Sequence, residues 1–207
     1  MEGKIIRAAA EGLAHKLNRY TNKEGLEFTK MVIGTEIMLI NISKLFLVYL
    51  IAVLLGTLIP TLITHGAYIL IKRFSFGLHA LNTTVCTVVS CILFALAPWL
   101  LSHLLLVSMG NSLVLAVFPF MILALYLYAP ADTKARPLVG KKLRTRLKWK
   151  AVVCGIILMA AALLVPNESA KFLMAMGAAF QVISILPITY KILKRSQHNY
   201  QQYENPA

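Results

Sequence analysis

Four stretches of this chain contain no Asp, Glu, Lys or Arg: residues 45–71, 74–131, 151–167 and 172–190. A helix needs about 20 mostly apolar residues to cross a bilayer, so the longest stretch has room for two crossings. Only 14% of the residues are charged and the mean hydropathy is +0.72, whereas about a quarter of a soluble domain is charged. The sequence therefore predicts an integral membrane protein with no room for a separate soluble catalytic domain.

We expect crossings at residues 84–107, 113–128, 151–165 and 172–190, with the polar residues 108–112 as a turn. The stretch 45–71 is too long for one upright helix and too short for two full ones. Pro60 interrupts it and His65 and Gly66 follow, which predicts a span to about residue 59 and a short or re-entrant return ending at Lys72 and Arg73. The predicted fold is an all-α integral membrane protein with about six membrane segments, one of them short or re-entrant.

The distribution of the net charge of +13 predicts the orientation of the chain. Residues 132–150 contain eight basic residues and one acidic residue, so the loop 130–150 should be cytoplasmic by the positive-inside rule. Basic residues also precede the first span and follow the last, which predicts that both termini are cytoplasmic. Aromatic residues are not interleaved with the basic ones, so we do not expect nucleic acid as a partner.

We divide the chain into a cytoplasmic N-terminal region (1–44), a multi-span membrane domain (45–195) and a mobile cytoplasmic tail (196–207). In the N-terminal region, apolar residues recur at helical spacing, and these are Ile6, Ala9, Leu13, Leu17 and Tyr20. This pattern is typical of an amphipathic helix on the inner leaflet. A solvated helix packed on the rest of the protein is the alternative.

One polar segment at a membrane entry, residues 73–86, places His79 and Cys86 seven residues apart. In a continuous helix seven residues rise about 10.5 Å, so contact between these two side chains requires a bend. Asn82 or Thr83 is a natural N-cap, which would put Cys86 in a first helical turn and leave His79 on a loop loosened by Gly77. A helix N-terminus and a nearby imidazole both favour a nucleophilic thiolate.

The alternative for any cysteine in an apolar span is a small buried hydrophobic residue, and Cys91 and Cys154 fit that description better than Cys86. The chain contains no CxxC pair, and its histidines and cysteines do not have metal-ligand spacing. We therefore expect neither a metal site nor a cofactor.

The run Arg73-x3-Gly77-x-His79-Ala80-x5-Cys86 resembles the signature of the AgrB (accessory gene regulator B) family, the membrane cysteine endopeptidases of Gram-positive quorum sensing. Residues 130–138, followed by the basic run, resemble a second segment of that family. One departure is that Phe76 stands where family members often have a glycine.

This resemblance implies that His79 and Cys86 are catalytic and that the substrate is an AgrD-like propeptide with an acidic C-terminal tail. It implies a thiol protease that forms a peptidyl thioester on Cys86, which leads to a cyclic thiolactone or lactone autoinducing peptide. It also implies a homodimer. The short or re-entrant return that ends at Lys72 and Arg73 would keep the following segment, and with it the active site, near the cytoplasmic face of the surrounding membrane lipid. Gly77 and Asn82 would shape the site, and His79 would be oriented by Asp132, by Asn82 or by a backbone carbonyl.

Basic residues are candidates for binding the acidic tail: Arg73, Lys141, Lys142, Arg144 and Arg146. The alternative for each is anchoring against anionic lipid. A different class of function also remains open, a small transporter or peptide-binding subunit without covalent chemistry. Such a protein would use Asn82, His103 and Gln181 as an intramembrane polar path.

Overall fold

The computed structural model describes residues 2–78, 83–103, 109–134 and 137–204, and this part of the chain is built from helices. In chain order they are α1 (Glu2–Thr21), α2 (Gly25–Leu54), α3 (Leu58–Ser75), α4 (Thr83–Cys91), the π-helical segment η1 (Ile92–Leu96), α5 (Ala97–His103), α6 (Asn111–Tyr128), α7 (Lys141–Leu164), α8 (Glu168–Ile185), α9 (Pro187–Ile192) and α10 (Gln201–Glu204). The predicted all-α class is confirmed.

Within the described residues, four helices are long and apolar enough to cross a membrane: α2, the continuous run Thr83–Leu101, α6 and α7. This finding supports the membrane assignment, but the predicted count of six segments is not confirmed. The helices α3 and α8 are not among the four, because α3 carries His65, Lys72 and Arg73 and α8 carries Glu168, Lys171 and Gln181.

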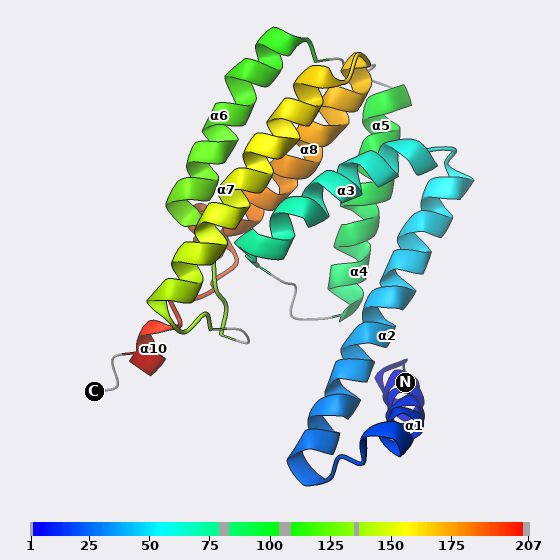
Figure 1. Cartoon of the computed structure of the whole chain (residues 1–207). Coiled ribbons are helices and arrows are strands. Elements are labelled where there is room, and N and C mark those ends of the chain that lie inside the picture. The colour runs from blue at the N-terminus through cyan, green and yellow to red at the C-terminus, as the bar shows by residue number, and fades with distance from the viewer. Residues whose placement is uncertain (1, 79–82, 104–108, 135–136, 205–207) are drawn as a thin grey trace.

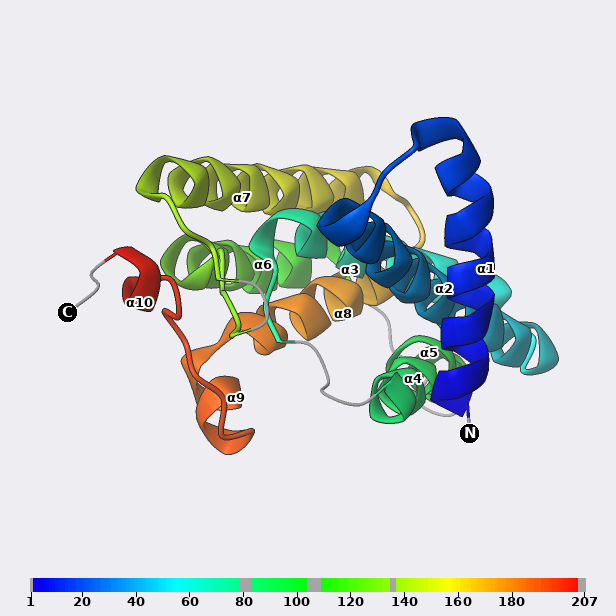
Figure 2. The same cartoon turned by 90° about the horizontal axis from the view of Figure 1, so that it is seen from below.

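Helix α3 lies between two groups of helices (Figures 1 and 2). On one side α6, α7 and α8 run alongside one another, and on the other side α2 packs beside α4 and η1. Gly177 of α8 makes this arrangement possible, because an added Cβ there would collide with the carbonyl oxygen of Thr64 in α3. The close approach of α3 and α8 fixes the centre of the molecule.

The break predicted at Pro60 occurs three to five residues earlier. Helix α2 ends at Leu54, and Gly56 makes the turn with a φ of +69°. Pro60 lies in the first turn of α3, where a missing backbone N–H leaves no intrahelical bond unmade. Glycine rather than proline therefore separates the two segments.

Two segments differ from their predicted conformation. Residues 141–150 form the first turns of α7 rather than part of a loop. The segment after Ser196, predicted to be a mobile tail, makes contacts up to Glu204: Tyr200 N–H donates to the Asp132 carboxylate over 2.9 Å, and Glu204 bonds Arg144. Pairing with side chains far away in sequence holds this tail.

Helix α1 packs on α2 through the fully buried Ala10 and Ala14. The larger apolar side chains Leu13, Leu17 and Tyr20 remain exposed, with Tyr20 at 90%. A helix that packs by alanines and exposes its larger apolar groups suits a membrane surface better than water.

Candidate functional site

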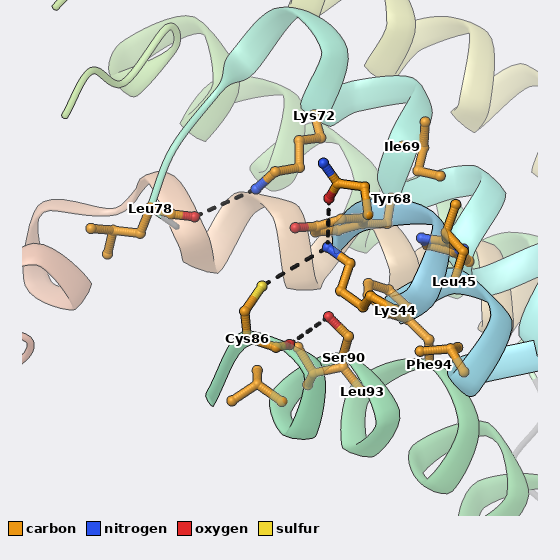
Figure 3. Close-up of a pocket in the computed structure, with 14 residues that line it drawn as sticks. Lys44, Leu45, Tyr68, Ile69, Lys72, Leu78, Cys86, Ser90, Leu93 and Phe94 are labelled. Atoms are coloured by element: carbon orange, nitrogen blue, oxygen red, sulfur yellow. Dashed lines mark hydrogen bonds between the residues drawn. The ribbon is translucent and has the colours of Figure 1, made fainter. Parts of the chain in front are cut away.

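Cys86 is the fourth residue of α4 as the structure describes this helix, from Thr83 onward. Its side chain is half-buried, and its sulfur faces a cavity of about 360 Å³ (Figure 3). Partial positive charge at a helix N-terminus favours an anionic thiolate. The position of Cys86 therefore suits a nucleophile.

The cavity is lined by residues of α2, α3, α4 and η1 together with Leu78. Its apolar wall is formed by Leu45, Val48, Ile69, Leu93 and Phe94. Its polar lining includes two lysines, Lys44 of α2 and Lys72 of α3, beside the thiol of Cys86. A cavity with one apolar wall and a few polar groups is the common form of a ligand site.

Lys44 contacts the candidate nucleophile, with its Nζ 3.9 Å from Cys86 Sγ. Lys72 lies across the cavity, with its Nζ 3.5 Å from the carbonyl oxygen of Leu78 and 5.1 Å from the centre of the Tyr68 ring (Figure 3). Sequence reasoning missed both lysines. The available signal was that Lys44 is the last charged residue before the first apolar stretch and Lys72 the first one after it.

The segment that leads to the predicted His79 is held by two other parts of the chain. Gly77 N–H donates to the Ala131 carbonyl over 2.9 Å, and Leu78 N–H donates to the Ser184 carbonyl over 3.1 Å. Gln181 of α8 donates to the Phe76 carbonyl over 2.7 Å. The two family-like motifs identified in the sequence are thus adjacent in space.

Gly77 is required by its surroundings as well as by its backbone. Its φ is +97°, and an added Cβ would lie 2.7 Å from Ser184 Oγ and 2.9 Å from Ile185 Cγ2. Phe76 also has a positive φ, of 56°, a conformation that glycine adopts most readily.

The predicted His79 and Asn82 lie outside the described residues, so the catalytic pairing of His79 with Cys86 stays a prediction. Asp132, one candidate for orienting His79, is buried and accepts from Tyr200 N–H. The carbonyl oxygen of Asp132 accepts from the Tyr190 hydroxyl over 3.0 Å. Asp132 therefore has a structural role in holding the C-terminal segment.

The candidate tail-binding residues do not line the cavity of Cys86. Arg73 is exposed at the end of α3, and its neighbour Lys72 faces the cavity instead. Lys141, Lys142 and Arg146 are exposed on the first turns of α7. The start of α7 and the start of α4 lie toward the same end of the molecule in Figure 1 and on opposite sides in Figure 2.

Arg144 already binds a carboxylate of this chain. Its guanidinium donates two hydrogen bonds to Glu204, over 2.6 and 3.0 Å, and the same carboxylate accepts from Gly140 N–H. The hydrogen bond from Arg144, and next the one from Gly140, hold the pKa of Glu204 below its usual value. The first turn of α7, which contains Arg144, is therefore able to bind a carboxylate.

These features define a class of protein: a helical membrane protein with a cysteine thiol at a helix N-terminus, in a cavity that also holds two lysines. A family model described as Accessory gene regulator B matches residues 10–185. The chain belongs to this family. The match includes the segment around Gly77 and Cys86 and the loop that pairs with it.

Relatives cover nearly the whole chain. A putative AgrB-like protein from Clostridium acetobutylicum is 43% identical over 206 residues, which is 99% of this chain and 97% of that protein. One from Listeria monocytogenes is 45% identical over 177 residues, 86% of this chain and 85% of that protein. Accessory gene regulator protein B from Staphylococcus intermedius is 32% identical over 191 residues, covering 89% and 95%. No solved structure matches the chain significantly.

Proposed function

We propose that the protein is a membrane cysteine endopeptidase that removes the C-terminal tail of an AgrD-like propeptide and leads to a cyclic autoinducing peptide. The observation that carries this proposal is the position of Cys86 in the first turn of α4, facing a cavity with Lys44 at 3.9 Å. Membership of the accessory gene regulator B family supports the same activity.

The reaction uses two residues of this chain. His79 takes the thiol proton of Cys86, and the thiolate then attacks the scissile carbonyl carbon, forming a C–S bond. The C–N bond breaks, and the acidic tail leaves as an amine after receiving the proton from His79. A thiol or hydroxyl of the substrate then attacks the thioester, so that a thiolactone or lactone ring closes and the Cys86 thiol is regenerated.

The ring can form without ATP because a thioester keeps its acyl group activated. Hydrolysis must be slower than ring closure, which requires that water be kept from the thioester. The apolar wall of the cavity, with Leu45, Val48 and Phe94, supports this requirement.

The acidic tail of the propeptide binds the exposed basic residues in the first turns of α7. Lys141, Lys142 and Arg146 have no carboxylate partner among the described residues. Arg144 can join them only if Glu204 leaves its guanidinium. These basic residues lie away from the cavity of Cys86. This separation suits a propeptide in which several residues lie between the cleaved bond and the acidic side chains of the tail.

We further propose that both termini and the start of α4 face the cytoplasm and that the chain acts as a homodimer. The basic first turns of α7 and the start of α4 lie toward the same end of the molecule (Figure 1), in agreement with the positive-inside rule. Gln181 does not support the alternative of a transporter with an intramembrane polar path. Its side chain is fully buried and donates hydrogen bonds to Ser75 and Phe76.

Mass spectrometry of the full chain in nanodiscs with a candidate propeptide tests the activity. Cys86→Ala and His79→Ala should each lower tail release at least about 1,000-fold and remove the acyl adduct. Cys91→Ala and Cys154→Ala are the matched controls and should retain activity. Tail release that survives in Cys86→Ala would refute the protease and leave a non-covalent transporter or binding subunit.

A further inference from the structure

Lys44 has an unusual position for a charged residue. It lies in α2, a candidate membrane span, and the residues after it up to Leu54 carry no charge. Its neighbours Phe46, Leu47 and Leu50 are exposed on the surface of α2, whereas Lys44 is half-buried and turned toward α4. An ionisable group within a membrane segment is costly and is usually functional.

The contacts of Lys44 are few. Its Nζ donates to Asn41 Oδ1 over 3.3 Å and lies 3.9 Å from Cys86 Sγ. No carboxylate comes within 4.0 Å of it in the described parts of the chain. The contact that can take a negative charge is therefore the sulfur of Cys86.

Other titratable groups share the cavity. They are His65, Tyr68 and Lys72, all on α3. Tyr49 Oη lies 2.9 Å from Nδ1 of His65, and Lys72 is directed to the Leu78 carbonyl and the Tyr68 ring. Lys44 is thus the cation for which a direct contact with the sulfur is established.

We propose that Lys44 is a third member of the site, an ammonium group that stabilises the thiolate of Cys86 before it attacks. This role rests on the proposed function, in which Cys86 is the nucleophile. Lys44 neither gives nor takes a proton in it. When the C–S bond forms, the negative charge moves from sulfur to the carbonyl oxygen, which lies one bond beyond the carbon under attack and so remains near the ammonium.

The size of the effect follows from the distance. An opposite charge within about 4–6 Å shifts an ionisation by about 1 to 3 pH units. Loss of the Lys44 charge should therefore raise, by that amount, the pH at which half of the Cys86 thiol reacts with an alkylating reagent. Lys72 remains in the cavity and keeps the shift toward the lower end of this range.

Alkylation measures this directly, without a peptide substrate. The full chain is placed in nanodiscs with Cys91→Ala and Cys154→Ala, so that Cys86 is the one remaining thiol, and the rate of reaction with monobromobimane is followed from pH 5 to 10. Lys44→Met should move the midpoint upward by about 1 to 3 pH units, and Lys44→Arg should restore it. Lys30→Met is the control, because Lys30 lies on the same helix, is exposed and pairs with Glu27.

Propeptide cleavage provides the second readout. Lys44→Met should lose cleavage at neutral pH and regain it as the pH rises, while a residue that only supports the fold would lose it at every pH. Lys44→Gln, which keeps a hydrogen-bond donor for Asn41, gives a second neutral variant if Lys44→Met folds poorly, and it should behave as Lys44→Met.

Two results would overturn the proposal: an alkylation midpoint that stays at the wild-type pH in both neutral variants, or one that rises equally in Lys44→Arg. The failure of the proposed function is a separate result. Cys86→Ala that still cleaves the propeptide would remove the endopeptidase, whatever the alkylation midpoint of Lys44→Met.

Discussion

Replacing Gly77 by alanine tests whether the backbone that leads to His79 must be held in one conformation. Two costs arise from the structure. A non-glycine residue at a φ of +97° costs about 1–2 kcal/mol. The added Cβ would lie 2.7 Å from Ser184 Oγ and 2.9 Å from Ile185 Cγ2, and forcing an extra carbon into a packed site costs about 1–3 kcal/mol.

Together the two costs amount to about 2–5 kcal/mol. We expect the segment around residue 77 to shift and relieve this strain, while the rest of the protein stays folded. The hydrogen bonds from Gly77 N–H to Ala131 and from Leu78 N–H to Ser184 are the contacts that the shift would break. Each 1.4 kcal/mol is a tenfold change in an equilibrium constant. The population of molecules that keep the wild-type conformation of this segment should therefore fall roughly 30-fold to several thousandfold. The rate of acyl-enzyme formation should fall by the same factor.

Single-turnover cleavage of the propeptide, measured by mass spectrometry, is the assay. Gly66→Ala is the matched control, because Gly66 lies on the exposed face of α3 with open space around its Cα, and alanine is the better helix former by about 0.5–1 kcal/mol. Adding Ser184→Ala to Gly77→Ala removes the nearest clashing atom and should recover part of the loss, but not the part due to φ. A Gly77→Ala rate within twofold of wild type would refute this reasoning.

Two further predictions concern the head of α7. Glutamine in place of the exposed basic residues Lys141, Lys142 and Arg146 should raise KM for the propeptide with little change in kcat, because uniform binding is lost; an unchanged KM at equal expression would leave lipid anchoring as their role. The pKa of Glu204 is held low by Arg144 and Gly140, so its contact is complete above the usual glutamate range and is lost as pH falls through the lowered pKa. The protection factor of the Gly140 amide, which is the intrinsic hydrogen-exchange rate at a given pH divided by the observed rate, should fall on acidification. Glu204→Gln should show the lowered protection already at pH 7; a variant with wild-type protection would argue against the carboxylate as the restraint.

Local signals in the sequence predicted several features of the site. N-cap chemistry at Asn82 or Thr83 predicted a helix that includes Cys86, and α4 is described from Thr83 onward. The predicted span 113–128 ends at the same residue as α6, Tyr128. Each of these predictions depends on neighbours within a few residues, where spacing along the chain determines position in space.

Contacts between distant segments could not be predicted in this way. The pairing of Gly77 with Ala131 joins residues 54 apart in sequence, and backbone hydrogen bonds of this kind leave no periodic pattern. Lys44 was assigned to the N-terminal cytoplasmic region because it ends a group of charges, yet α2 continues through it without a break. The composition of the segment after Ser196 is polar and predicted a mobile tail. Its Glu204 accepts a hydrogen bond from Arg144, which lies 60 residues away in sequence.

The arrangement of the helices explains why the site needs contacts from α2 and η1 as well as from the motif itself. The segment before His79 is tied to α8 and to the loop at Ala131, whereas Cys86 belongs to α4, which packs against α2. Residues 79–82 join these two groups in sequence, so the approach of the thiol to that segment depends on what holds α4 against α3. Phe94 of η1 does this, because it is buried with its ring centre 4.5 Å from that of His65 and 4.8 Å from that of Tyr68. A π-helical turn shifts the residues after it around the helix axis, and in this chain that turn contains the aromatic ring that packs on α3.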